Sequence, residues 1–297
     1  MAKFTVADIK ALRILLMAKF TVADIKALRQ KTGAGMLDVK KALEEAGGDI
    51  AKAEEAIRVK GLKAVAKREG RTAANGLVAS AVTDVDGGQR GILVEVNAET
   101  DFVAKNQKFI DMADEILQAA VEAGAGDVDS VLAAQLGEAT VKDRVEGLIA
   151  VIGEKMEISH VAVVEGEHVE AYMHRTNPDL PPQVGVLVAT DAAGASVAHD
   201  VAVHIAALNP AYLDRASVPE EVVEAETRIA TETTIAEGKP EKAIPKIVQG
   251  RMNGFYKSTV LLDQGFARDP KVSVGKIVDQ AGGKVTGFAR IRVGSAE

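Results

Sequence analysis

The chain has 297 residues, of which 47% are hydrophobic and 27% are charged, so it is long enough to form two or more folded domains. Its formal net charge of -7, its 3% of aromatic residues and its lack of tryptophan provide neither the basic surface nor the stacking platforms of direct nucleic-acid binders. The absence of cysteine excludes disulfides and thiolate sites, and no apolar run approaches the roughly 20 residues of a membrane span, so we expect a cytoplasmic protein without membrane attachment.

An identical repeat opens the chain, since residues 1–13, MAKFTVADIKALR, recur without change as residues 17–29. The spacing of the two copies is shorter than the roughly 20 to 50 residues of structural repeats, so we do not expect two stacked units. Asp8 and Lys10 interrupt any apolar stretch, which argues against a signal peptide. We therefore expect the fold to begin with the second copy, and residues 1–16 to be a duplicated, peripheral extension.

Residues 21–57 have the pattern of three short helices. Thr21 and Asp24 have the spacing of a capping box, and Asp49 is placed to cap the third helix. The apolar positions that recur at helical spacing are Val22, Ile25 and Leu28 in the first helix, Met36, Val39 and Leu43 in the second, and Ile50, Ala53 and Ile57 in the third. Met36 is interpreted as packing the first helix against the second. A basic helical linker follows from residue 62.

Two strands and a long helix are predicted next. Residues 77–83 and 91–97 have strand patterns on either side of a turn at 84–88. The apolar residues that then recur at helical spacing are Phe109, Met112, Ala113, Ile116, Leu117, Ala120 and Val121. Thr100 and Asp101 supply N-cap chemistry where the strand hands over to the helix.

This corner admits two interpretations. In the structural one, Asp101 caps the helix and Phe102, seven residues before Phe109, lies on the core face of a continuous helix. Periodicity alone favours that interpretation, because apolar stripes at this spacing are usually core. In the functional one, Asp101 and Phe102 project from a rigid support and contact a partner.

The second half of the chain repeats the pattern of the first. The segment GVLVAT at 185–190 echoes GILVEV at 91–96. The remaining predicted elements are a helical region at 131–149, strands at 160–165, 168–174 and 284–293, and a helix at 196–208. Two copies of a strand-strand-helix-strand unit predict an α+β fold with two similar subdomains packed together.

An antiparallel helical hairpin is predicted between residues 218 and 252, inserted in the second unit. Its outgoing arm carries Val222, Ala225, Ile229 and Ile235, and the two arms are expected to bury one seam against each other. Pro245 falls in the first turn of the returning arm, where proline is tolerated.

The sequence carries no motif for catalysis or metal binding. It has neither a phosphate-binding loop nor a dinucleotide fingerprint. His199 and His204 are five residues apart on a helix and therefore diverge, while His160, His168 and His174 occupy strands without a carboxylate at ligand spacing. We expect a protein that is not an enzyme and holds no cofactor or metal of its own.

Three stretches carry a family resemblance. They are LVEVNAETDFVAKN at the corner, LRQKTGAGMLDVKKALEEAGGDIAKAEEAIR in the N-terminal helices and EGKPEKAIPKIVQGRMNGFYKSTVLLDQGF from the hairpin onward. Together they closely resemble bacterial elongation factor Ts, the guanine nucleotide exchange factor of elongation factor Tu. The resemblance implies binding to the GDP-bound and nucleotide-free partner, disruption of the partner's magnesium and phosphate site, and promotion of GDP release.

The resemblance also implies an organisation in parts: a small ubiquitin-associated-like helical domain, a linker, a core of two subdomains and a coiled-coil insertion. The expected boundaries are 17–60 for the helical domain, 61–75 for the linker, 76–166 for the first subdomain, 167–216 with 259–297 for the second, and 217–258 for the inserted hairpin.

Site residues follow by the same resemblance. Residues Thr100, Asp101, Phe102 and Val103 would bind the partner and dislocate its magnesium ion. Further partner contacts would be made by Arg29, Met36, Leu37, Ile152 and His174. Two other functions stay open on the residues alone: a ubiquitin-associated-like adaptor without exchange activity, and a hydrolase whose site is not visible as a motif.

Overall fold

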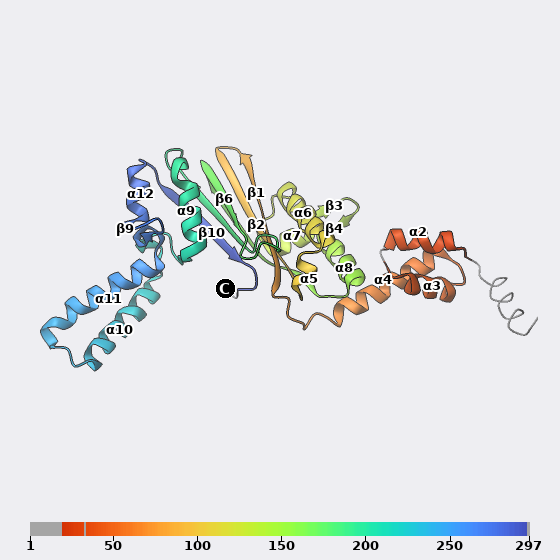
Figure 1. Cartoon of the computed structure of the whole chain (residues 1–297), viewed down its shortest axis with the longest axis horizontal. Helices are drawn as coiled ribbons and strands as arrows, with labels where there is room; N and C mark the ends of the chain where they lie inside the picture. Colours follow the sequence, from red (N-terminus) through yellow and green to blue (C-terminus); the bar gives the residue numbers. More distant parts are fainter. Residues whose placement is uncertain (1–19, 33, 296–297) are drawn as a thin grey trace, which may run out of the picture.

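The computed structural model describes residues 20–32 and 34–295, so the duplicated extension at 1–16 lies outside the described residues. The chain is elongated, with three N-terminal helices at one end, two β-sheets in the middle and a pair of long helices at the other end (Figure 1). The α+β class expected from the sequence is confirmed. No helix in the described part of the chain combines the length and apolar character needed to cross a membrane.

The N-terminal helices are α2 (Val22–Thr32), α3 (Met36–Glu45) and α4 (Ile50–Ala66). The predicted capping box is present, because Thr21 N–H donates to Asp24 Oδ2 at 2.6 Å and Asp24 N–H donates to Thr21 Oγ1 at 3.2 Å. Asp49 caps α4 by accepting the Lys52 N–H at 3.1 Å. Helix α4 runs without a break past residue 60, so the expected boundary between domain and linker falls inside one helix.

The core of this bundle is smaller than the predicted stripes. Its buried members are Leu28, Val39, Ala42, Leu43 and Ala53. Val22, Met36 and Ile50 are exposed, so each of the three predicted stripes has its first residue in solvent. Three short helices have too little surface in mutual contact to bury a complete stripe on each.

Two three-stranded antiparallel sheets form the centre of the molecule. The first has the order β1-β2-β5, from β1 (Asn75–Val85), β2 (Gly88–Ala98) and β5 (Met156–Gly166). The second has the order β10-β7-β6, from β6 (His168–His174), β7 (Val184–Thr190) and β10 (Val285–Arg292). Each unit runs strand, strand, helix, then a later third strand, and the second strand is central in both. The long helices are α6 (Gln107–Glu122) and α9 (Ala195–Leu208).

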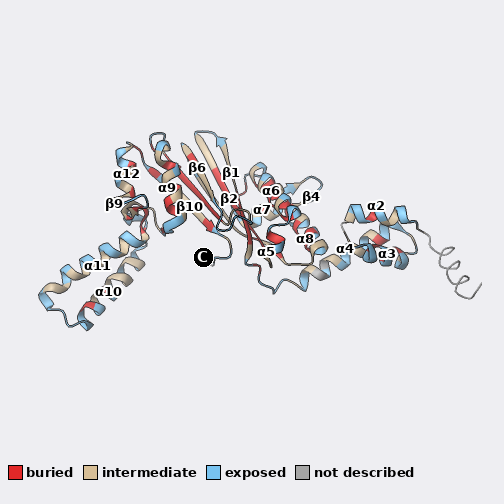
Figure 2. Cartoon of the chain, viewed as in Figure 1, coloured by how far each residue is buried: buried red, intermediate tan, exposed pale blue. Residues whose placement is uncertain are grey.

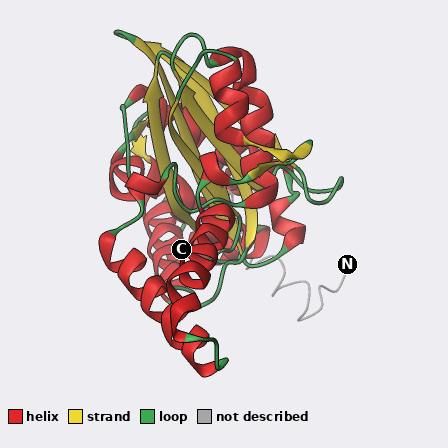
Figure 3. Cartoon of the chain, turned by 90° about the vertical axis from the view of Figure 1, so that its left-hand side faces the viewer, coloured by secondary structure: helices red, strands yellow, loops and turns green. Residues whose placement is uncertain are grey.

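The two sheets pack face to face, with helices on their outer sides (Figure 3). Buried residues follow the strands and the inner faces of the helices that cover them (Figure 2). Glycine allows the sheets to approach: a Cβ added to Gly91 would lie 2.7 Å from Val169 Cγ1, and one added to Gly185 would lie 2.7 Å from Val78 Cγ1. Gly91 and Gly185 hold equivalent places in the two units, so the close approach is reciprocal.

The inserted hairpin consists of α10 (Glu220–Ala236) and α11 (Ile244–Thr259), and Pro245 lies in the first turn of α11. Ile229 and Ile235 are 51% and 57% exposed, so the prediction that they lie in the seam is wrong. The buried residues of α10 are Ala230 and Thr234. Across the hairpin, Thr227 Oγ1 on α10 donates to Met252 Sδ on α11 at 3.5 Å.

Several short elements have no counterpart in the sequence prediction. In the first unit these are the paired strands β3 (Gln135–Leu136) and β4 (Ala139–Thr140), which divide the helical region predicted at 131–149 into α7 (Val128–Ala133) and α8 (Val141–Ile152). The second contains β8 (Gly265–Phe266), β9 (Asp269–Ser273) and α12 (Val274–Gln280). Short 3-10 turns occupy Arg215–Ser217, Glu241–Ala243 and Leu261–Asp263.

Candidate partner-binding site

The corner after β2 is a separate helical turn, α5 (Asp101–Ala104). Thr100 is its N-cap, with Oγ1 accepting the Val103 N–H at 3.4 Å, so the prediction that Asp101 caps the helix is wrong. Asn106 then caps α6 by accepting the Lys108 N–H at 3.0 Å, which starts the long helix afresh.

This break decides between the two interpretations of Phe102. A continuous helix would place Phe102 and Phe109 on one face, but the chain turns between them. Phe109 is 0% exposed in the core, whereas Phe102 is 71% exposed. The interpretation of Phe102 as a core residue is therefore wrong, and its ring projects into solvent.

The turn that carries the exposed side chains of the corner is anchored by its buried residues. Val103 and Ala104 are buried and anchor the turn against the first subdomain. Lys105 lies between the two predicted site residues: its Nζ is 3.7 Å from Asp101 Oδ2 and 4.5 Å from the centre of the Phe102 ring. The sequence alone does not distinguish Lys105, because charge pairs four residues apart are common on helices.

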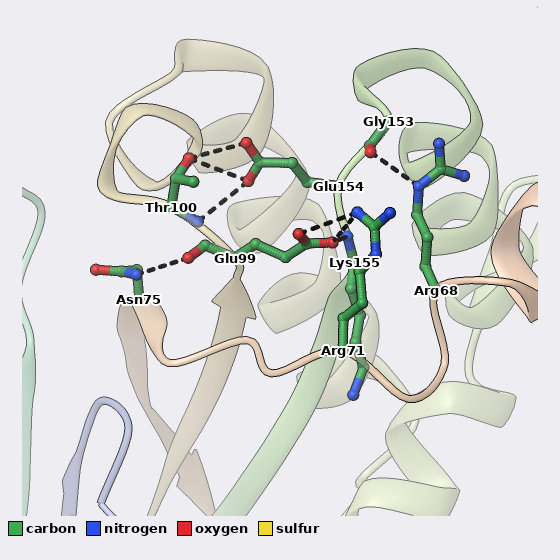
Figure 4. A network of polar contacts seen from close by, with 8 residues as sticks. All are labelled: Arg68, Arg71, Asn75, Glu99, Thr100, Gly153, Glu154 and Lys155. Carbon is green, nitrogen blue, oxygen red and sulfur yellow. Dashed lines mark hydrogen bonds and ion pairs between the residues drawn. The ribbon is translucent and has the colours of Figure 1, made fainter.

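A polar network supports the corner from below (Figure 4). Thr100 donates its N–H to Glu154 Oε2 at 3.1 Å and its hydroxyl to Glu154 Oε1 at 2.9 Å. Lys155 N–H donates to Glu99 Oε1 at 2.6 Å, and Arg71 Nη1 lies 3.2 Å from both oxygens of that carboxylate. The Lys155 N–H, and after it the Arg71 guanidinium, lower the pKa of Glu99 below its usual value, which keeps this carboxylate ionised.

Ile152 lies beside this network, at the end of α8 and two residues before Glu154. Its side chain is partly buried against the first core. Gly153 ends the helix with a φ of 87°, a left-handed conformation that favours glycine. The structure therefore brings Ile152 to the same corner as the predicted residues at 100–103.

His174 lies at the corresponding end of the second sheet, where β6 stops, and its side chain is exposed. Its Nδ1 is 3.1 Å from the Tyr172 hydroxyl. The loop after it packs against the first sheet, because Val78 N–H donates to Pro182 O at 2.9 Å. Val78 is three residues from Asn75, which pairs with Ala98 just before the corner. His174 and the corner are therefore at the same end of the paired sheets.

Comparison with known proteins identifies the family of this chain. A family model described as "Elongation factor TS" matches residues 99–295. The elongation factor Ts of Beutenbergia cavernae is 61% identical over 297 residues, covering 99% of this chain and all of the relative. Those of Micrococcus luteus and Arthrobacter sp. are 58% and 55% identical, each over 298 residues that cover 99% of this chain and all of the relative. The chain belongs to the elongation factor Ts family.

The second group of predicted contacts lies on the N-terminal helices, before the residues that the family model matches. Arg29 on α2 and Met36 and Leu37 at the start of α3 are all exposed, Met36 by 54% and Leu37 by 82%. The interpretation of Met36 as a packing residue between two helices is therefore wrong. The helices α2 and α3 that carry these residues lie apart from α5, beyond α4 at one end of the molecule (Figure 1).

The described histidines of this chain form no metal site. Among the described residues, no group of three or more histidine, aspartate or glutamate side chains could hold a metal ion. His160 Nδ1 is 2.6 Å from Glu95 Oε2, and the other oxygen of that carboxylate accepts hydrogen bonds from Asn97 Nδ2 and the Gly294 N–H. His204 is buried, with Nε2 at 2.8 Å from Gln264 Oε1 and Nδ1 accepting the Ala267 N–H at 3.1 Å. Burial lowers the pKa of His204, so this imidazole is neutral at pH 7.

Proposed function

We propose that this chain is the guanine nucleotide exchange factor of elongation factor Tu and acts through the corner at residues 100–103. It binds the GDP-bound partner, promotes release of GDP during translation elongation, and remains on the nucleotide-free partner until GTP replaces the lost nucleotide. The observation that carries the proposal is the exposed Phe102 beside Asp101 on a rigid turn. Membership of the elongation factor Ts family provides the partner.

The mechanism follows from differential binding. A factor that binds nucleotide-free elongation factor Tu more tightly than the GDP-bound form must weaken GDP binding by the same ratio, because the two equilibria are linked. In the proposal, Phe102 and Asp101 enter the nucleotide domain of the partner and displace the groups that hold its magnesium ion. Loss of that ion removes the largest positive charge beside the GDP phosphates, so the nucleotide leaves faster.

The other proposed contacts have separate tasks. The exposed Arg29, Met36 and Leu37 grip the partner away from its nucleotide and supply affinity. Ile152 and His174 widen the contact around the corner, His174 towards the phosphate-binding region of the partner. The magnesium ion belongs to the partner, so the factor itself takes part without a cofactor, a chemical reaction or direct contact with nucleic acid.

The domain organisation is part of the proposal. The helices of residues 17–60 act as a ubiquitin-associated-like domain, and residues 61–75 link them to the core. The first subdomain at 76–166 carries the corner, while 167–216 with 259–297 forms the second subdomain. The hairpin at 217–258 is a coiled-coil insertion between the parts of the second subdomain.

Release of a fluorescent GDP analogue from elongation factor Tu tests the function. In the presence of excess unlabelled GDP, the wild-type chain at substoichiometric concentration should accelerate release with multiple turnovers. Asp101→Asn, which removes one charge at the corner, should lower that acceleration, whereas Asp114→Asn on the exposed face of α6 is the matched control. Binding of the two proteins without acceleration would instead support the adaptor function.

A further inference from the structure

At the base of the corner, residues 99 and 100 just after β2 are hydrogen-bonded to residues 154 and 155 just before β5. The ladder between β2 and β5 ends with Ala98 opposite Met156. Beyond it, the Glu154 carboxylate accepts the Thr100 N–H, and the Glu99 carboxylate accepts the Lys155 N–H, at 3.1 and 2.6 Å. The two glutamate side chains thus connect the two segments beyond the point where the backbone hydrogen bonds of the sheet end (Figure 4). We call these four residues, 99, 100, 154 and 155, the glutamate clamp.

The clamp reaches the first turn of α5 through a hydroxyl. Thr100 Oγ1 donates to Glu154 Oε1 at 2.9 Å and also accepts the Val103 N–H at 3.4 Å. A helix of four residues is too short to be stable by itself, because forming the first turn costs more than one hydrogen bond returns. The orientation of α5 therefore depends on buried Val103 and Ala104 below it and on the clamp at its start.

The clamp is also tied to the chain that descends from the N-terminal helices. Arg71 donates to both oxygens of Glu99 at 3.2 Å, and Arg68 Nε donates to Gly153 O at 2.8 Å. Both arginines follow the last turn of α4. One polar network thus joins the end of α4, the start of α5 and the end of α8.

We propose that Glu154 and Glu99 are positioning residues for nucleotide exchange, which hold the turn carrying Asp101 and Phe102 in the orientation that enters the partner. The inference rests on the proposed exchange function and adds residues that need not touch the partner. A carboxylate that accepts two hydrogen bonds restrains Thr100 more strongly than water, which exchanges freely. Without the clamp, α5 keeps its buried anchor but loses the restraint on its direction.

Exchange kinetics at saturating factor distinguish positioning from binding. Glu154→Ala should lower the maximal rate of GDP release by about tenfold, equivalent to about 1.4 kcal/mol. Its Kd for nucleotide-free elongation factor Tu should change by less than about threefold, because the N-terminal contacts are untouched. Glu154→Gln keeps an acceptor oxygen for Thr100 and should recover most of the rate.

Glu115→Ala is the matched control. Glu115 on α6 accepts two hydrogen bonds from Arg144 on α8, at 2.6 and 3.3 Å, so it also links two elements of the first subdomain through a carboxylate. Neither of these bonds involves a residue of the corner, so Glu115→Ala should leave the maximal rate at the wild-type value. A loss equal to that of Glu154→Ala would show a general effect of loosening the subdomain and would overturn the inference.

A double-mutant cycle tests whether the clamp acts through Phe102. In a Phe102→Ala background the turn has no ring to position. Glu154→Ala should then lower the maximal rate by less than about twofold, because the effects of mutations at coupled sites are not additive. A full further loss in that background would overturn the inference. If Glu154→Ala does not fold, Thr100→Val removes the bridging hydroxyl with little change of shape, and an unchanged maximal rate in that variant would overturn it equally.

The two proposals fail in different ways. No acceleration by the wild-type chain would reject the exchange function and the clamp with it. Normal acceleration by the wild type, with a wild-type maximal rate in both Glu154→Ala and Glu154→Gln, would reject the clamp alone.

Discussion

Replacing Phe102 by alanine should leave the fold stable and abolish most of the exchange activity. Phe109 provides an internal comparison, because it is the same residue type seven positions later with the opposite environment. Phe102 is 71% exposed and Phe109 is 0% exposed. The same substitution at the two positions therefore separates a functional ring from a structural one.

The expected magnitudes follow from these exposures. A fully buried aromatic side chain removes roughly 150 to 250 Å² from water, so Phe102 buries about 60 Å². At roughly 25 cal/mol per Å² this burial is worth at most about 1.5 kcal/mol, and alanine retains part of it. The contact with Lys105 adds about 0.5 to 1 kcal/mol at an exposed site. Phe109→Ala should instead cost about 3 to 5 kcal/mol, because it leaves a cavity in a packed core.

Thermal unfolding and GDP release on the same preparations provide the assay. Phe102→Ala should melt within a few degrees of the wild type, at roughly 2 to 4 °C per kcal/mol for a chain of this size, and should exchange poorly. Phe109→Ala should melt much earlier, yet its folded fraction should exchange normally at low temperature. The reasoning is refuted if Phe102→Ala is as unstable as Phe109→Ala and regains normal exchange once enough folded protein is present.

Three further outcomes are expected. Deletion of residues 1–16 should leave GDP release and the melting temperature nearly unchanged, and a large loss in either would show that the extension is integrated into the fold. Arg29→Ala combined with Met36→Ala should weaken binding of elongation factor Tu by about 1 to 3 kcal/mol, measured by calorimetry, with a smaller effect on exchange at saturation. Because burial lowers the pKa of His204, only the unfolded chain gains a proton there as the pH falls below about 6.5, and urea unfolding should show stability falling by up to about 1.4 kcal/mol per pH unit. His204→Gln, whose amide stays neutral, should flatten this slope, and an unchanged slope would contradict the assignment.

The strand and helix framework was predictable because its signals are local. Alternating apolar residues gave β6 at 168–174 with its observed bounds, and the echo of GILVEV in GVLVAT pointed to the two equivalent central strands. Capping residues such as Asp49 also acted where the sequence placed them. Each of these patterns spans only a few neighbouring residues, so it needs no knowledge of the tertiary fold.

The errors arose where a pattern was compatible with two arrangements. Phe102 and Phe109 have helical spacing whether or not the helix is continuous, and the deciding N-cap at Asn106 was not recognised. Val22 and Ile229 belong to apolar stripes that are wider than the surface their helices bury. For Phe102 the break in the helix decides the outcome, and for Val22 and Ile229 the extent of the packed surface decides it. Periodicity alone contains neither kind of information.

The supporting residues of the corner could not be predicted at all. Glu99 and Lys155 are 56 positions apart, and Thr100 and Glu154 are 54 apart, so no local pattern relates them. Family resemblance points to residues that touch the partner, and it passes over residues that hold those side chains in place. Only the tertiary fold brings these residues together, because it places the end of β2 beside the start of β5.

Stiffness is the property that connects these features to exchange. A ligand shifts an equilibrium only by its difference in affinity for the two states, and a side chain that can bend away contacts both states of the partner equally well. Helix α4, whose 17 residues span about 25 Å, leads from the gripping surface to Arg68 and Arg71 at the clamp. Binding at Met36 and Leu37 would therefore bring Phe102 to the partner at a fixed distance and angle. A flexible linker of equal length would preserve much of the affinity through effective concentration alone, but it would leave the ring free to yield instead of the magnesium site.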